Sequence, residues 1–313
     1  MKYPRRVLGS AKAVLNVPAM GVRCLGGPDD DVTDREQLVK LAIDEGAGFL
    51  DMSVVRDGPY MEGWLRAALD GRRESVVLVT SADAGDGAQP GRPAASGRPE
   101  EARAAARAAL ARLGAGQADL YFLVDDDPAV PIEETWGALL GFVEDGSVRY
   151  LGLRNTTPDR LRRAHAVHPV TALEVTWSLW SREIETTGLL SAARSLGAGI
   201  VATSPLGGGS VRDEADLGAP LPVELASPEE LPSSGPVSTG RERIARDLWY
   251  IARQRGVSLA QVALAWVLAK GPDVVPVMSA RRAAHLLENL DAVNVVLYER
   301  EIDVLDLASQ ARG

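Results

Sequence analysis

The chain has 313 residues, of which 46% are hydrophobic and 25% are charged, a composition typical of a globular protein and not of a disordered or collagen-like one. Its 34 basic and 43 acidic residues give a net charge of −9. An acidic surface repels nucleic acid and anionic membranes, so we expect neither as a partner. The one cysteine, Cys24, excludes a disulfide framework. Since no apolar stretch is long enough to cross a bilayer and the first residues lack a signal-peptide core, we expect a cytoplasmic protein.

Short apolar runs alternate with longer amphipathic stretches along most of the chain. Runs of about five residues rich in Val, Ile and Leu, flanked by turn residues, are typical of strands buried on both faces. Capping boxes, Thr33 with Glu36 and Ser258 with Gln261, indicate helix starts. The sequence predicts strands at 18–22, 48–52, 76–80, 120–124, 149–153, 172–177, 199–203 and 273–277. It predicts helices at 33–46, 59–71, 99–113, 132–144, 158–167, 187–196, 258–270 and 280–291.

Eight strand–helix units in a row favour a closed (β/α)8 TIM barrel, of α/β class, over an open sheet. We interpret residues 1–313 as a single domain, with a hairpin within 6–17 that closes the bottom of the barrel. Two long connections, 81–98 and 206–240, are rich in Gly and Pro and follow the third and seventh strands. They are expected at the C-terminal face, where the active sites of such barrels are built.

Four stretches of sequence stand in a recognisable order and spacing: Gly48-Phe49-Leu50-Asp51 with Glu62; Asp119-Leu120-Tyr121 leading to Pro131 through Trp136; Ser204-Pro205-Leu206-Gly207; and Arg281-Arg282 with His285 and Glu288-Asn289. In these stretches the chain resembles the aldo-keto reductase superfamily, over nearly its whole length. The resemblance implies a (β/α)8 barrel that binds NADPH in an extended conformation and reduces carbonyls. It also implies a catalytic tetrad of Asp, Tyr, Lys and His, in which the tyrosine donates the proton.

Only one member of that tetrad stands at its matching position. The aspartate is Asp51, but the tyrosine, lysine and histidine positions hold Arg56, Ser81 and Val124. No shift of a few residues restores the lysine or the histidine, because neither residue type lies between residues 41 and 164, and the sole conceivable stand-in for the tyrosine is Tyr60, at the start of a predicted helix where a packing role is the commoner one. A tyrosine ionises near pH ~10 and is a poor acid unless neighbouring cations lower the cost. We therefore expect ordinary carbonyl reduction to be absent.

The positions that the resemblance assigns to the nicotinamide also differ. Arg154 precedes Asn155 where the family has Ser-Asn, Glu174 replaces a glutamine, and a threonine replaces a stacking tyrosine. A lone charge at the barrel mouth is costly. We therefore expect Arg154 to pair with Glu174 across neighbouring strands, and Arg56 to pair with Asp51. These four charged residues are the candidate catalytic residues.

The adenosine end of the implied site is better preserved. Arg281 and Arg282, at the start of the last predicted barrel helix, match the positions that hold an adenosine 2′-phosphate. A cationic fork beside a helix N-terminus suits a phosphate dianion. The resemblance thus implies NADP(H) as cofactor, and the candidate cofactor-binding residues are Asn155, Ser204, Leu206, Gly207, Arg281, Arg282, His285, Glu288 and Asn289.

Two acidic runs and a histidine pair are the remaining candidates for a metal site. The runs are 29–31 and 125–127, and the pair is His165 with His168. Hard cations take several oxygen ligands, but solvated acidic loops are commoner. A helix C-terminus accommodates histidine through the helix dipole alone. We therefore expect no metal.

Three functions remain open. The first is a non-standard step, of lyase, isomerase, cyclase or hydrolase type, on a small anionic or nucleotide-like metabolite, because carboxylates and arginines converge on the mouth. The second is NADPH-dependent reduction of an activated enone, imine or carbonyl with another proton donor. The third is a non-catalytic binding or regulatory role, which would be marked by a large exposed apolar patch. The oligomeric state is left open.

Overall fold

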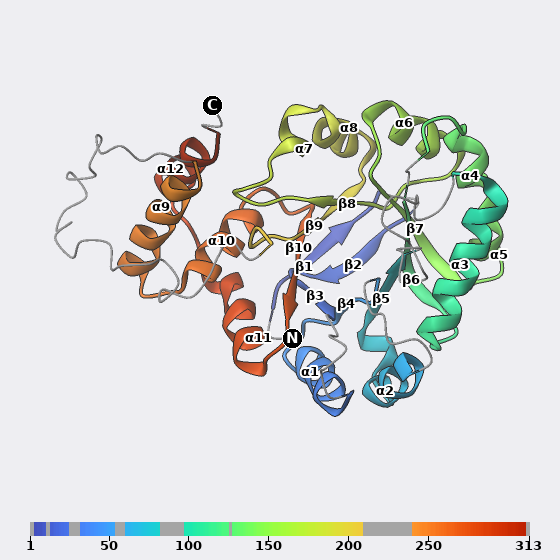
Figure 1. The fold of residues 1–313 in the computed structure, drawn as a ribbon, viewed down its shortest axis with the longest axis horizontal. Helices are drawn as coiled ribbons and strands as arrows, with labels where there is room; N and C mark the ends of the chain where they lie inside the picture. Colours follow the sequence, from blue (N-terminus) through green and yellow to red (C-terminus); the bar gives the residue numbers. More distant parts are fainter. Residues whose placement is uncertain are drawn as a thin grey trace.

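The computed structural model describes residues 3–10, 13–24, 32–53, 60–81, 97–124, 127–208 and 240–310. Eight parallel strands close into a barrel in the order β10-β3-β4-β5-β6-β7-β8-β9, and helices surround it (Figure 1). The prediction of a (β/α)8 barrel is confirmed. The barrel strands are β3 (Gly21–Cys24), β4 (Phe49–Asp51), β5 (Val77–Ser81), β6 (Ala118–Val124), β7 (Val148–Arg154), β8 (Ala172–Thr176), β9 (Gly199–Thr203) and β10 (Val274–Ala280).

The helices form the outer layer, and most of them fall where the sequence predicts them. The helices are α1 (Val32–Asp44), α2 (Tyr60–Leu69), α3 (Pro99–Leu113), α4 (Ile132–Ala138), α5 (Leu140–Glu144), α6 (Pro158–Val167), α7 (Glu183–Thr186), α8 (Leu189–Leu196), α9 (Gly240–Arg255), α10 (Leu259–Leu268), α11 (Ala283–Leu290) and α12 (Glu299–Gln310), with short 3-10 turns at Arg73–Ser75 and Asp291–Asn294. Helices α7, α9 and α12 were not predicted from the sequence; α9 and α12 pack against each other beside α10 (Figure 1).

The hairpin expected within residues 6–17 is present. Strands β1 (Arg5–Leu8) and β2 (Leu15–Pro18) pair antiparallel, with Leu8 opposite Leu15. Leu8, Leu15 and Val17 are buried in the cluster that fills the barrel interior. Leu8 lies against Gly199 so closely that a Cβ at this glycine would collide with it. The hairpin therefore closes the N-terminal end of the barrel.

Alternate strand residues point into the barrel and fill it with apolar side chains. Phe49 and Phe122 are fully buried there. Gly21 makes room for one of these rings, because a Cβ at Gly21 would lie 2.5 Å from Phe49 Cδ1. Gly152 makes the same room for Phe122. Since strand residues alternate between faces, residues two positions beyond these, toward the C-terminal ends of the strands, point into the barrel above an apolar floor.

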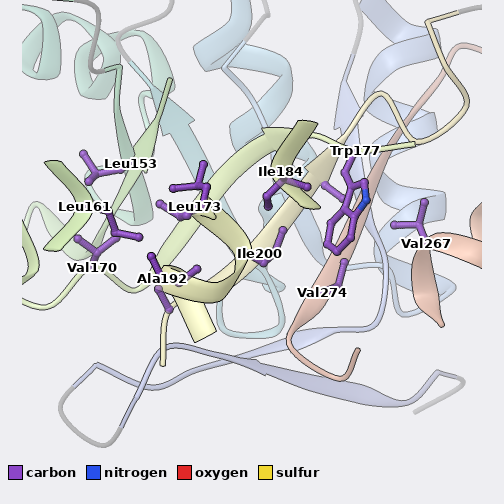
Figure 2. Packing of buried hydrophobic residues seen from close by; sticks show 14 of the residues in the cluster. Leu153, Leu161, Val170, Leu173, Trp177, Ile184, Ala192, Ile200, Val267 and Val274 are labelled. Atoms are coloured by element: carbon purple, nitrogen blue, oxygen red, sulfur yellow. The ribbon is translucent and has the colours of Figure 1, made fainter. Parts of the chain in front are cut away.

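The outward faces of the strands pack against the helices. Figure 2 shows Leu153, Leu173 and Ile200, from β7, β8 and β9, meeting helix residues such as Leu161 of α6 and Ala192 of α8. These strands are therefore buried on both faces, which is why their sequences are continuous apolar runs.

Several predicted boundaries are wrong for local reasons. The first barrel strand begins at Gly21 and not at residue 18, because residues 15–18 belong to the hairpin. The helix predicted at 132–144 breaks at Leu139 into α4 and α5. Helix α1 begins at Val32, so Thr33 lies inside it, whereas Ser258 precedes α10, accepts a hydrogen bond from Gln261 N at 3.2 Å and completes its capping box.

The long connections 81–98 and 206–240 fall largely outside the described residues. Of the helices that the structure does describe, none combines the length and the apolar character needed to cross a bilayer.

Candidate functional site

Four charged side chains lie together at the C-terminal end of the barrel, which we call the mouth. Arg23 on β3 is in register with Asp51 at the end of β4. Arg154, at the end of β7, is in register with Glu174 on β8. Two neighbouring-strand pairs of opposite charge thus face the same space.

Arg23 joins the two pairs across the barrel. Its Nε donates a hydrogen bond to Asp51 Oδ2 at 2.7 Å, and its Nη2 donates to Glu174 Oε1 at 2.5 Å. Strands β3 and β8 are separated by β10 and β9 in the barrel order, so the contact with Glu174 crosses the lumen. The side chain of Arg23 is 11% exposed, and those of Asp51 and Glu174 are 1% exposed. The guanidinium therefore fills the centre of the mouth.

Asp51 is fully engaged by its neighbours. While Oδ2 accepts from Arg23, Oδ1 accepts from Ser53 N at 2.9 Å and from Ser53 Oγ at 2.5 Å. With both oxygens holding donors, the carboxylate anchors Arg23 and is poorly placed to exchange a proton with a substrate.

Glu174 has a different environment from Asp51. Its Oε1 accepts from Arg23 and lies 3.9 Å from Arg154 Nε. Its Oε2 is buried and accepts no hydrogen bond in the part of the chain that the structure describes. Burial, together with the charge of Asp51, raises the pKa of Glu174 above its ordinary value, against the opposing pull of Arg23 and Arg154.

Arg23, the cation beside Glu174, stays protonated. Burial alone works to lower the pKa of Arg23, but the charges of Asp51 and Glu174 outweigh burial and raise that pKa above the ordinary arginine value. Arg23 therefore remains a hydrogen-bond donor to Oε1. Oε2 is the oxygen of Glu174 that holds no donor among the described residues.

The pairing predicted between Arg154 and Glu174 across neighbouring strands is confirmed, at 3.9 Å. The closer partner of Glu174 is Arg23, which the sequence analysis missed because the predicted strand at 18–22 ended one residue before it. The signal was present, since Arg23 is a charged residue two positions beyond an inward-facing glycine. Arg56 lies outside the described residues, so its pairing with Asp51 stays a prediction.

The positions that would carry the lysine and histidine of the tetrad lie in the same mouth. Ser81 ends β5 and Val124 ends β6, and both are buried. Val124 is in register with Arg154. Neither side chain is a cation or an imidazole, so β5 and β6 place no group there that would ease the ionisation of a tyrosine.

The candidate nucleotide-binding turn after β9 is formed. Ser204 and Asn155 have φ values of 50° and 56°, a left-handed conformation that is uncommon for residues other than glycine and clusters at functional sites. Gly207 N donates to Ser204 O at 2.8 Å and closes the turn, which also contains the half-buried Leu206. Both strained residues directly follow barrel strands at the mouth.

The start of α11 presents an exposed cationic surface. Arg281 and Arg282 are exposed and form no ion pair with another described residue. Arg282 is the N-cap, and no side chain caps the first turn, so its backbone N–H groups are open to an anion. His285 and Glu288 are exposed on the same helix, and Asn289 is buried.

These residues fit one end of NADP(H) and not the other. Exposed arginines and an uncapped helix start suit the adenosine phosphate. At the mouth, however, Glu174 is 1% exposed and its Oε1 already holds Arg23. Of the two oxygens of Glu174, Oε1 is thus occupied by Arg23 and only Oε2 is without a described donor.

The predicted metal candidates behave as structural residues where they are described. His168 caps the end of α6, and His165 Nδ1 accepts from Val170 N at 3.3 Å. Asp127 Oδ1 accepts from Ala129 N at 2.9 Å, while residues 29–31, 125 and 126 lie outside the described residues. Across the described ranges there is no group of three or more side chains placed to hold a metal ion.

Comparisons with known proteins agree with this architecture. The sequence model of the aldo/keto reductase family matches residues 20–309. The crystal structure of a thermostable aldo-keto reductase in complex with the inhibitor epalrestat is similar to this chain, with 26% sequence identity and a TM-score of 0.75. The match covers 97% of this chain and 99% of that one. The chain therefore belongs to the aldo/keto reductase family.

Proposed function

We propose that this chain catalyses a proton-transfer step, of lyase, isomerase, cyclase or hydrolase type, on a small anionic or nucleotide-like metabolite. The observation that carries the proposal is Glu174 Oε2, a buried carboxyl oxygen that accepts no hydrogen bond from a described residue. The raised pKa of Glu174 supports the same role, because a carboxyl whose protonated form is favoured can donate a proton as well as accept one.

Each charged residue of the mouth has a distinct role in this proposal. Glu174 Oε2 takes a proton from the substrate or donates one to it. Arg154, whose side chain is 27% exposed, is accessible from solvent and attracts the substrate's carboxylate or phosphate. Arg23 and Asp51 hold the set in place. The negative charge of an arriving anion favours the protonated form of Glu174.

The direct test is deuterium incorporation from D₂O, because it reports proton transfer before the product is known. Probes are small 2-oxo and 3-oxo carboxylates and sugar phosphates, each followed by NMR. Glu174→Gln should lower the rate by about 10²- to 10⁴-fold, the usual contribution of a general acid or base. Glu133→Gln, on the exposed surface of α4, is the matched control and should leave the rate unchanged. Exchange that survives Glu174→Gln, or no exchange with any probe, contradicts the proposal.

A second candidate is NADPH-dependent reduction of an activated enone, imine or carbonyl. The observations in its favour are the closed turn from Ser204 to Gly207 and the exposed pair Arg281 and Arg282. When bound, NADPH supplies a hydride, and these residues are the ones that would hold its phosphates. Substrates of this kind need less acid assistance than a ketone, so the missing tetrad matters less for them.

The two candidates are separated by NADPH oxidation with a cyclic imine and an activated enone. Two results together would replace the first proposal with the second: Glu174→Gln leaves the rate of NADPH oxidation unchanged, and Arg281→Ala raises the KM for NADPH. Absence of NADPH oxidation with every probe removes the second.

A further inference from the structure

We propose that Arg23 is a positioning residue for Glu174: by holding Oε1 from across the lumen, it leaves Oε2 as the one oxygen that exchanges protons. This inference rests on the proposed function, because it assigns a role to Arg23 within the same proton-transfer site. No feature of the family resemblance had singled out Arg23.

The geometry gives Arg23 a role that no neighbouring-strand contact supplies. Its partner in register is Asp51, yet its Nη2 reaches Glu174 at 2.5 Å on the far side of the barrel. The register partner of Glu174 is Arg154, which is more distant, at 3.9 Å, and more exposed. The short contact to Oε1 therefore comes from Arg23.

Arg23 is itself held in place. Its Nε donates to Asp51 Oδ2 at 2.7 Å, and the other oxygen of Asp51 is fixed by two hydrogen bonds from Ser53. Beneath it, the inward position two residues earlier on β3 is Gly21, packed against Phe49. A planar guanidinium anchored on one side by a fixed carboxylate offers its remaining donors in a fixed direction.

The two oxygens of Glu174 thus become unequal. A carboxyl oxygen that already accepts a charge-assisted hydrogen bond is a weaker site for a proton than one with no donor. The charged groups of other elements that face Glu174 are Arg23 on β3, Asp51 on β4 and Arg154 on β7. Of these, only Arg23 donates a described hydrogen bond to this carboxyl.

The test follows the protonation of Glu174 without any substrate. Protein labelled with ¹³C at glutamate Cδ is titrated by NMR, and the Glu174 signal is assigned by its loss in Glu174→Gln. Arg23→Met keeps side-chain length and removes the cation, so the midpoint of Glu174 should move to higher pH. Arg23→Lys keeps the charge but cannot bridge both carboxylates, so its midpoint should lie between those of the wild type and Arg23→Met.

The matched control is Arg182→Met. Arg182 is equally buried, at 11% exposure, and also bridges two carboxylates, Glu185 at 2.5 Å and Asp306 at 3.1 Å, away from the mouth. Its loss should leave the Glu174 midpoint unchanged. An unchanged midpoint in Arg23→Met and Arg23→Lys overturns the inference, as does an equal shift in Arg182→Met. If Arg23→Met does not fold, the comparison of the Glu174 midpoint in Arg23→Lys with that in Arg182→Met decides.

The deuterium assay separates this inference from the proposed function. On an exchanging probe, Arg23→Met should lower the rate at neutral pH at least tenfold and displace the pH profile in the direction of the NMR midpoint. If Glu174→Gln loses the exchange activity but Arg23→Met keeps the pH–rate profile of the wild type, the positioning role of Arg23 is refuted and the proposed function stands. A shifted NMR midpoint with no exchange by the wild type refutes the proposed function and leaves the coupling of Arg23 to Glu174 standing.

Discussion

Replacing Arg23 by methionine should destabilise the fold strongly, because it leaves two buried carboxylates facing each other. Asp51 and Glu174 are 1% exposed, and the next cation among the described residues, Arg154, is 3.9 Å from Glu174. Removing one partner of a buried ion pair costs about 3–5 kcal/mol. In a chain of 313 residues, about 2.1 cal/mol/K of unfolding entropy per residue makes 1 kcal/mol equal to about 1.5 °C, so the melting midpoint should fall by about 5–8 °C.

The assay is a double-mutant cycle by urea denaturation at pH 7, with Arg23→Met, Glu174→Gln and the double variant. Because Arg23 serves both carboxylates, Glu174→Gln should recover only part of the loss, and adding Asp51→Asn should recover more. The control is Arg163→Met, which breaks an exposed pair with Glu133 and should cost far less. Equal losses for Arg23→Met and Arg163→Met, or purely additive effects in the cycle, would refute the reasoning.

Three further predictions concern other parts of the account. The folded-state pKa of Glu174 is raised, so the contribution of Glu174 to stability is greatest below its unfolded pKa of about 4.3 and is lost as pH rises through the folded pKa. The unfolding free energy of the wild type minus that of Glu174→Gln should therefore fall as pH rises. An increase of this difference with pH would contradict the assignment. Arg281→Ala with Arg282→Ala should weaken calorimetric binding of adenosine 2′,5′-bisphosphate by about 10- to 150-fold, and unchanged affinity would remove the phosphate site. Gly152→Ala should collide with Phe122 and cost about 1–3 kcal/mol, and wild-type stability in urea would show that the ring has room to move.

The barrel was predictable because its strands are buried on both faces. Continuous apolar runs placed seven of the eight barrel strands within a few residues of their observed positions, and the rhythm of units predicted closure. The first strand was misplaced because residues 15–18 and 21–24 form two successive strands, of the hairpin and of the barrel. The local hydrophobic pattern does not show where one strand ends and the next begins.

The site was predictable only where partners lie on neighbouring strands. The pairing of Arg154 with Glu174 could be predicted because the two residues lie at the ends of neighbouring strands and carry opposite charges. The contact between Arg23 and Glu174 joins residues 151 positions apart across the lumen, and it depends on the closed barrel and on the inward face of β3. A strand boundary one residue later would have placed Arg23 at the mouth, but its contact with Glu174 across the lumen is not visible in a linear sequence.

The central claim is that this mouth moves protons and does not support ordinary carbonyl reduction, and NADPH oxidation with nitrobenzaldehyde tests that claim most directly. The family resemblance matches Ser81 and Val124 to the reductase lysine and histidine and Glu174 to the residue that holds the carboxamide, and Glu174 is hydrogen-bonded to Arg23. The absorbance of NADPH should fall no faster with the protein than without it. Turnover on the order of 1 s⁻¹ or more, the range typical of enzymes, would contradict it.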